Sequence, residues 1–339
     1  MKYPLTFSCF LIFIATFGQA KIDSLVKIGV KYHDEGRYDD AIRTYNEALL
    51  IDKNSPLVNY ELSFTYFMKN DCEKSIEHAD YAIQNGDEYL SMPAVITKGS
   101  CLDNLGKTEE SIALFKNAIE KYKPNHLIYY NLGLDYYKIS DYANAEDAFL
   151  KAIDLKDSHA SSHLLLGYTM EKKQKKVQSL LPLFFFLILE PDTDRSKVAY
   201  EVLMKQFVGN VEKDKNKPNQ INININSSSL GSEFSSAELM LSMMVATKSA
   251  KEIKGTADES FFVENTATFF KMLGEMKKEN NEGVWWAYYI PLFDKIARSE
   301  HHETFINYIS QSSNSNAKTW LEENNDKLNR FAEWFQNQY

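Results

Sequence analysis

The chain has 339 residues and is acidic, with 47 Asp and Glu against 38 Lys and Arg and a formal net charge of −9. It lacks the basic face of nucleic-acid binders, so we expect no nucleic-acid partner. Three cysteines make no disulfide framework in a chain of this length, and with only 13 glycines we expect no phosphate-binding glycine-rich loop.

Residues 1–20 have the composition of a secretory signal peptide. Lys2 precedes an apolar run from Leu5 to Phe17, and Gly18-Gln19-Ala20 places small side chains where a signal peptidase reads them. The alternative is a retained anchor, because the run is only slightly shorter than the ~20 residues that span a bilayer. We expect cleavage and export to the periplasm or envelope of a Gram-negative bacterium, with no membrane-spanning segment in the mature chain.

A small residue then recurs with a period of about 34 residues. The members are Gly29, Ser63, Gly99, Gly133 and Gly167, which stand 34, 36, 34 and 34 positions apart. Around each of them, large and small side chains alternate at spacings of 3, 4 and 7, which are the spacings of one helical face. This pattern predicts a solenoid of paired helices.

The period divides this part of the chain into about five helix-turn-helix repeats. Their bounds are 22–55, 56–89, 92–125, 126–159 and about 160–193. Turns are expected at Gly36, Asn70, Gly106 and Ser140. Within a repeat, the small residue at position 8 is expected to let two helices approach closely, with large side chains such as Tyr45 filling the gaps.

Residues 22–193 resemble the tetratricopeptide repeat family. The resemblance is carried by segments such as Tyr129-Tyr-Asn-Leu-Gly-Leu-Asp-Tyr136, followed by Ala145 and Phe149-Leu-Lys-Ala152. It implies an all-α superhelix whose first helix in each repeat lines a concave groove. At the groove positions implied by the resemblance, this sequence has Tyr60, Phe64, Phe67, Tyr130, Leu134, Tyr137 and Tyr168.

An aromatic groove of this kind suits an extended peptide or an amphipathic helix. Two interpretations stay open. In the first, the protein is an exported interaction module or adaptor that holds a protein or peptide partner. In the second, the rings are covered by the chain's own later helices, and the protein is a structural scaffold or an envelope-assembly subunit. Some family members bind a free C-terminal carboxylate through Lys and Asn side chains. The corresponding positions in the first two repeats of this sequence are Val26, Val30 and Glu61, so we expect no recognition of a free carboxylate.

The fifth repeat departs from the pattern. Pro182 falls inside its second helix, so we expect either a kink or a helix that begins near Ser179 with Pro182 in its first turn. The run Leu183–Leu189 is apolar all round, and such a helix is normally buried on every side. The C-terminal half of the chain is therefore expected to cover it.

Residues 194–231 are expected to form a helix, Asp194 to about Val211, and a polar linker. Within the linker, Gln220–Asn226 alternates strictly between polar residues and isoleucine, which predicts a short strand or an extended arm. No partner strand is apparent, so we favour a mobile linker.

Residues 232–339 are expected to form an all-α C-terminal cap. The predicted helices are Ser235–Ile253, Ala257–Lys278, Gly283–Arg298, His301–Ser310 and Asn316–Gln338. Ser235 and Glu238 have the spacing of a capping box. The region resembles no catalytic domain that we recognise.

The sequence offers little chemistry. His301 and His302 are adjacent, so they point about 100° apart on a helix and cannot clamp one metal; solvated or capping roles are expected. The lysines of 172–176 are expected to form a solvated corner, and Cys72 and Cys101 to serve packing. We therefore expect no enzyme, no cofactor, no catalytic residue and no metal site.

Overall fold

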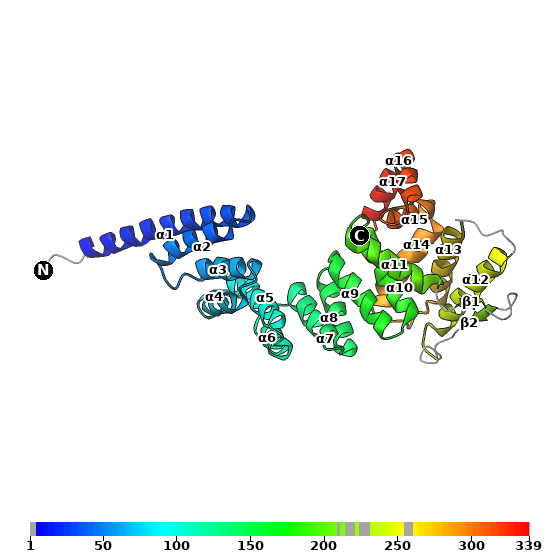
Figure 1. Ribbon diagram of the computed structural model, residues 1–339, viewed down its shortest axis with the longest axis horizontal. Helices are drawn as coiled ribbons and strands as arrows, with labels where there is room; N and C mark the ends of the chain where they lie inside the picture. Colours follow the sequence, from blue (N-terminus) through cyan, green and yellow to red (C-terminus); the bar gives the residue numbers. More distant parts are fainter. Residues whose placement is uncertain (1–4, 209–210, 214–220, 224–230, 254–259, 339) are drawn as a thin grey trace. The chain divides into compact units, whose positions relative to one another are not determined.

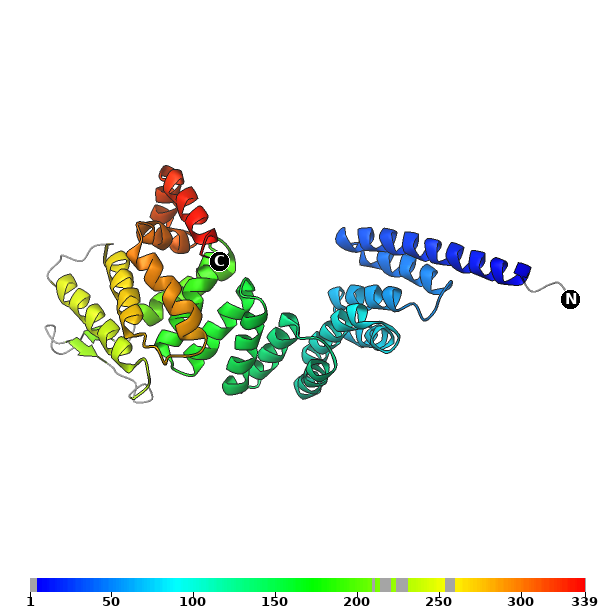
Figure 2. The ribbon, with the colours of Figure 1, turned by 180° about the vertical axis from the view of Figure 1, so that it is seen from behind.

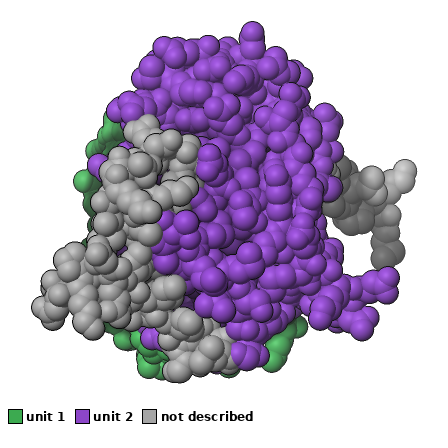
Figure 3. Space-filling model, turned by 90° about the vertical axis from the view of Figure 1, so that its right-hand side faces the viewer, with its two compact units in different colours: residues 1–141 green, residues 142–339 purple. Residues whose placement is uncertain are grey.

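The computed structural model describes residues 5–208, 211–213, 221–223, 231–253 and 260–338 (Figure 1). Most of the expected polar linker and the break expected near Gly255 lie outside these residues. By its internal contacts the chain divides into two compact units, residues 1–141 and 142–339 (Figure 3). The domain boundaries expected at 193 and 231 stay predictions.

Unit 1 is built from consecutive helix pairs, in which α1 packs on α2, α3 on α4, and α5 on α6, with α7 following. The helices are α1 (Leu5–Asp34), α2 (Tyr38–Leu49), α3 (Pro56–Met68), α4 (Cys72–Asn85), α5 (Glu88–Asn104), α6 (Thr108–Lys121) and α7 (His126–Lys138). Among the described residues of the whole chain, no helix combines the length and the apolarity needed to cross a membrane.

The small residues of the repeats lie where the paired helices approach most closely, as expected. A Cβ atom built on Gly29 would overlap the ring of Tyr45, and one on Gly99 would overlap the ring of Phe115. In unit 2, a Cβ on Gly167 would meet Cγ of Leu183 at 2.7 Å. Each large side chain therefore fills the space that glycine leaves on the neighbouring helix.

The expected turns are confirmed, and they share one backbone geometry. Gly36, Asn70, Gly106 and Ser140 have φ values of 73°, 61°, 75° and 64°. After each of them the chain returns a hydrogen bond to the preceding helix, as in Arg37 N–H to Tyr32 O at 2.8 Å. A residue in the left-handed region, followed by a backbone hydrogen bond to the last turn of the helix, is the common motif that ends helices and favours glycine. Gln174, with φ 58°, adds a turn of the same hand in unit 2.

Unit 2 continues with helices and one two-stranded sheet. Its elements are α8 (Tyr142–Leu155), α9 (Ala160–Lys172), α10 (Lys176–Leu189), α11 (Asp194–Val208), β1 (Val211–Lys213), β2 (Ile221–Ile223), α12 (Ser235–Ile253), α13 (Ser260–Met276), the π-helical turn η2 (Trp285–Tyr289), α14 (Ile290–Arg298), α15 (His302–Ser310), α16 (Ser315–Glu323) and α17 (Asn325–Gln336).

Helix α10 is the centre of unit 2. Every residue from Lys176 to Ile188 is buried, and the covering elements include α9, α11, α12, α15 and η2, which fulfils the expectation that later helices cover this run. In Figure 2 the orange segment that holds α14 crosses in front of green helices of this unit. The alternative start near Ser179 is wrong, because the helix begins at Lys176 and contains Pro182 in its interior.

The N-terminus of α10 corrects two expectations. Ser235 is the first residue of α12 and not its N-cap, so the expected capping box is not formed. Glu238 instead accepts a hydrogen bond from the Lys176 backbone N–H at 3.1 Å. Its carboxylate thus caps another helix. Lys176 is also buried rather than part of a solvated corner, and burial lowers the pKa of its ammonium group to about 8. A local sequence pattern cannot reveal the contact between Lys176 and Glu238, since the two residues stand 62 positions apart.

The alternating isoleucine segment is a strand with a partner. Strand β2 pairs antiparallel with β1, and Val211 lies opposite Ile223. The expectation of an unpartnered segment is therefore wrong for Ile221–Ile223. The sequence places residues 211–213 in a helix end and a linker, because three residues are too few for a period-two pattern to emerge; the structure forms β1 there.

The C-terminal helices differ from expectation at two points. The helix expected over 316–338 is divided into α16 and α17 at Asn324. His301 is the N-cap residue of α15, as one of the two expected roles had it, but its side chain makes no capping hydrogen bond. Both histidines are buried and not solvated, and His302 Nε2 donates to Val263 O at 2.9 Å. The indole of Trp334 lies 5.2 Å from the His301 ring, so this pair belongs to the aromatic core.

Candidate functional site

Three rings from α1 and α3 form a stacked row in unit 1. The ring of Phe64 lies between the others, 4.9 Å from His33 and 6.5 Å from Tyr60, and the interplanar angles are 20° and 11°. All three side chains are partly exposed. We call these residues the ring row. Parallel rings of this kind present a flat apolar face that a partner's side chains can cover at little cost in conformational entropy.

A hydrogen bond fixes the orientation of the His33 ring. The Thr65 hydroxyl donates to Glu61 O at 2.8 Å, so its oxygen is left to accept from His33 Nδ1, also at 2.8 Å. The proton on neutral His33 is thereby assigned to Nδ1 by the network. Burial lowers the pKa of His33, although the charge of Asp34 opposes this shift. The imidazole therefore behaves as a neutral aromatic ring at pH 7.

Tyr60 joins the ring row to a buried cluster of small residues. Its side chain packs against Ala79, Ala82 and Ala94 of α4 and α5, and burial raises the pKa of its hydroxyl. The neighbouring carboxyl of Glu61 is also partly buried, which raises its pKa, and it accepts a hydrogen bond from the Tyr45 hydroxyl at 3.5 Å. The ring row is therefore anchored to the core of unit 1.

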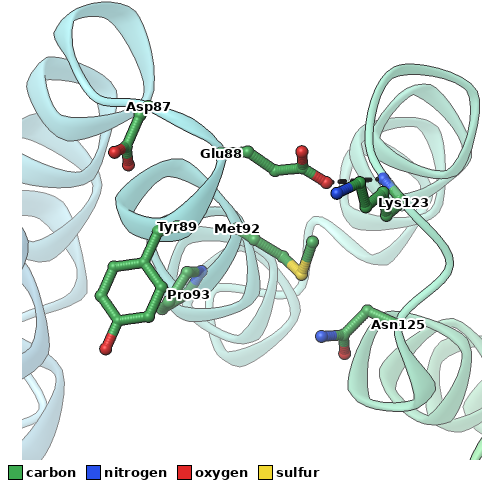
Figure 4. Close-up of a pocket in the computed structure, with 7 residues that line it drawn as sticks. All are labelled: Asp87, Glu88, Tyr89, Met92, Pro93, Lys123 and Asn125. Atoms are coloured by element: carbon green, nitrogen blue, oxygen red, sulfur yellow. Dashed lines mark hydrogen bonds between the residues drawn. The ribbon is translucent and has the colours of Figure 1, made fainter.

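A cavity of about 570 Å³ opens at the start of α5 (Figure 4). We call it the Tyr89 pocket. It is lined by Asp87, Glu88, Tyr89, Met92, Pro93, Lys123 and Asn125. Tyr89 is 84% exposed, although a tyrosine ring is a large apolar surface. In Figure 4 the thioether of Met92 points into the space between α5 and the segment that carries Lys123 and Asn125.

Hydrogen bonds at the helix ends hold the walls of this pocket. Asp87 caps α5 by accepting from Leu90 N–H at 3.1 Å, and Asn125 caps α7 by accepting from Leu127 N–H at 2.8 Å. Glu88 Oε1 accepts from the Lys123 backbone N–H at 2.8 Å, which joins the two walls. The lining of the pocket thus combines apolar side chains, Met92 and Pro93, with polar ones, a mixture suited to binding.

The structure brings some of the predicted groove residues together. Tyr60 and Phe64 stack, and Phe67 is partly buried on the same helix. Tyr130, Leu134 and Tyr137 stand four and three residues apart on α7, each partly buried. Tyr168 is partly buried on α9 of unit 2. Their joint role as one groove stays a prediction.

The Tyr89 pocket was missed from the sequence. The third repeat was expected to start at residue 92, whereas α5 begins at Glu88, so Tyr89 was assigned to the end of the second repeat. Asp87, followed by Glu88, is a helix-start signal that would have moved this boundary.

Groups that suggest catalysis or metal binding are scarce in the described part of the chain. No cluster of three or more His, Cys, Asp or Glu side chains there has a geometry that would hold a metal ion. Cys72 and Cys101 are both buried with free thiols, and burial raises the pKa of Cys101 to about 12. A thiol with so high a pKa is a poor nucleophile at neutral pH.

Comparison with known proteins identifies the repeats. Residues 29–70 match a family described as TPR repeat, and residues 97–174 match one described as Tetratricopeptide repeat. Together with the helix pairs and their left-handed turns, these matches show that the chain contains tetratricopeptide repeats.

Individual relatives are distant. The chain is 28% identical over 163 residues to the TPR repeat-containing protein MJ1428 of Methanocaldococcus jannaschii; the match covers 46% of this chain and 27% of that protein, so it spans about a quarter of the relative's length. Among solved structures, pilF of Pseudomonas aeruginosa superposes with a TM-score of 0.50 at 19% identity, over 56% of this chain and 86% of that one. MamA has a TM-score of 0.43 at 25% identity, over 48% of this chain and 94% of that one.

Proposed function

We propose that this protein is an exported interaction module whose unit 1 holds a segment of a partner protein against the ring row and the Tyr89 pocket. The observation that carries the proposal is Tyr89, an aromatic ring left 84% exposed at a cavity that Met92 and Pro93 also line. Aromatic side chains at the rim of a pocket are typical anchors of protein interfaces. The predicted residues Phe67, Tyr130, Leu134 and Tyr137, all of unit 1, extend the proposed surface.

The local packing supports a role in binding. Three rings stack with one another, yet each keeps an exposed part. Tyr60 and Glu61 are tied to the core, so the surface is held in place before a partner arrives. A pre-organised surface loses less conformational entropy on association than a mobile one.

Export is part of the proposal and rests on the composition of residues 1–20. Cleavage after Ala20 would leave Lys21 as the first residue and shorten α1. Ile22 and Val26, which are 3% and 8% exposed, belong to the core of unit 1 and stay in the shortened helix. The intact mass of the protein recovered from the envelope tests this part. A chain that retains residues 1–20 contradicts cleavage but not binding.

Affinity capture from envelope fractions tests the binding surface. Tyr89→Ala is compared with the wild type and with Tyr81→Ala, a matched control on α4 whose tyrosine is 44% exposed. We expect Tyr89→Ala to deplete at least one captured protein by about fivefold or more, because interface aromatics dominate binding energy. Tyr81→Ala should capture the wild-type set.

Two further experiments decide between an interaction module and a self-covered scaffold. A photo-crosslinking amino acid at position 89, but not at position 81, should join the chain to the depleted protein. The double variant Tyr130→Ala/Tyr137→Ala extends the test to α7. If all variants capture the same proteins, and the α7 variant only lowers the melting temperature, the self-covered scaffold is the better description.

A further inference from the structure

A second surface, on unit 2, has the features of a binding site that the proposed function does not use. Two adjoining cavities, of about 450 and 300 Å³, both have Asp157 and Tyr288 in their walls. Their walls come from the end of α8 and the turn that follows it, from residues 283–288 at η2, and from the C-terminal parts of α10 and α17. We call the two cavities together the Tyr288 groove.

The chemistry of the Tyr288 groove is apolar at one end and acidic at the other. Phe185, Leu189 and Phe335 line the smaller cavity. Asp154 and Asp157, both exposed, line the larger one. Lys151 pairs with Asp154 at 3.5 Å, but both side chains are mostly exposed, so this pair is weak. Among the described residues no ion pair engages the carboxylate of Asp157.

One buried side chain fixes both walls of the groove. His163, which is fully buried, donates from Nε2 to Asp157 O at 2.6 Å and accepts from the Tyr289 hydroxyl at Nδ1, also at 2.6 Å. A carbonyl oxygen can only accept, so the proton is assigned to Nε2. Burial lowers the pKa of His163 to about 3, which keeps the ring neutral. The groove therefore exists before a ligand binds.

The backbone of η2 adds an independent indication. Tyr288 belongs to a π-helical turn, and such turns are rare and frequently mark functional sites. The turn directs Tyr289 into the core, where it is fully buried, and leaves Tyr288 partly exposed between the two cavities. The ring of Tyr288 packs edge-on against Phe185 at 5.2 Å.

We propose that the Tyr288 groove binds an extended segment of a partner protein in which an aromatic or branched aliphatic residue is followed by lysine or arginine. The apolar side chain enters the smaller cavity, against Phe185 and Phe335. The cationic side chain pairs with Asp157. The net charge of −9 favours the approach of such a basic segment. The groove lies wholly within unit 2, so this binding does not depend on the ring row or the Tyr89 pocket.

An array of acetylated, amidated decapeptides tests the proposal with the full-length protein. Each peptide carries Phe, Leu or Ile followed by Lys, Arg, Gln or Glu in a Gly-Ser background. We expect the protein to select Phe-Lys and Phe-Arg peptides, and raising the salt to 0.5 M to weaken binding, since the Debye length falls to roughly 4 Å. Asp157→Asn should weaken the selected peptides about three- to fivefold, as for an exposed ion pair.

Three further variants sharpen the result. Ala287→Arg places a long cation in the larger cavity from an exposed lining residue and should abolish the selection. Asp147→Asn, an exposed carboxylate on α8 that does not line the groove, should leave it unchanged. An array without selection, or one whose peptides bind Asp157→Asn and Ala287→Arg like the wild type, overturns the proposal. If Tyr89→Ala alone removes the selected binding, the peptides occupy unit 1, which supports the proposed function and rejects this second site.

Discussion

Units 1 and 2 are both built from paired helices, but they differ in how much of each helix is buried. In unit 1, α3 and α4 bury one face each and leave rings such as Phe64 partly exposed. In unit 2, α10 is buried all round, and Phe184 alone has five other phenylalanine rings within 6.5 Å. The comparison shows that one repeat pattern supports either an open face or a closed core, depending on whether the second helix is amphipathic or apolar throughout.

The closed core of unit 2 predicts the largest effect. Phe184→Ala removes a ring that is fully buried, so we expect unit 2 to lose about 3–5 kcal/mol of unfolding free energy. All four tryptophans of the chain, at positions 285, 286, 320 and 334, lie in unit 2. Tryptophan fluorescence during urea unfolding therefore reports on this unit alone. A midpoint shift of less than 0.3 M would contradict the central role of α10.

Close helix packing predicts the next effect, in unit 1. Gly99→Ala places a Cβ against the ring of Phe115, and the resulting overpacking should cost about 1–3 kcal/mol. Far-UV circular dichroism should record the loss, whereas tryptophan fluorescence should not change. Adding Phe115→Leu to Gly99→Ala makes room for the new methyl group and should restore part of the stability. If the stability changes of the two single variants simply add in the double variant, the two residues do not interact.

A buried carboxyl makes the stability of unit 1 depend on pH. Asp135 is 3% exposed, one of its oxygens has no hydrogen-bond partner in the described structure, and burial raises its pKa to about 7. The folded chain thus holds this proton more tightly than the unfolded chain, whose pKa is about 3.9. The stabilisation is complete below about pH 4 and is lost as the pH rises through 7.

Asp135→Asn should remove this dependence, because an amide stays neutral. We expect the unfolding free energy of the variant, measured relative to that of the wild type, to be higher at pH 8 than at pH 4 by on the order of 1–3 kcal/mol. Urea unfolding followed by circular dichroism at both pH values measures the difference. The same difference at pH 4 and pH 8 would mean that folding does not raise the pKa of Asp135.

The smallest effect concerns how helices are capped in the two units. In unit 1, Asp87 and Asn125 cap their own helices, whereas α10 is capped by Glu238 from α12. Glu238→Ala should destabilise unit 2 by about 1 kcal/mol, while Glu238→Gln, which keeps an acceptor oxygen, should lose less. Fluorescence-detected unfolding separates the two variants. Equal losses would indicate that the hydrogen bond itself contributes nothing.

The sequence predicts best what depends on neighbouring residues. The spacing of Gly29 and Tyr45 indicated a contact that the structure contains, and the bounds expected for α12 are those observed. Both follow from periodicity within a few helical turns. The ring stack of Phe64 and Tyr60 follows from their spacing of four on one helix.

Contacts across long stretches of chain were not predictable in this way. Nothing near Lys176 indicates that Glu238 covers its backbone, and nothing near His163 indicates a bond to Tyr289, which stands 126 residues later. These contacts depend on which helices meet, and a single sequence carries no local signal for that. The Tyr288 groove was missed for the same reason, since its walls come from four separate segments.

The recurring left-handed turn has a consequence for the length of the protein. Gly36, Asn70 and Gly106 follow the ends of α1, α3 and α5, the first helices of three successive repeats, in the same backbone geometry and at intervals of 34 and 36 residues. A segment copied from one such turn to the next would therefore begin and end in compatible conformations. Gene duplication or engineering at these turns can therefore lengthen the solenoid by one repeat at a time, because the inserted repeat connects through a turn of the same geometry.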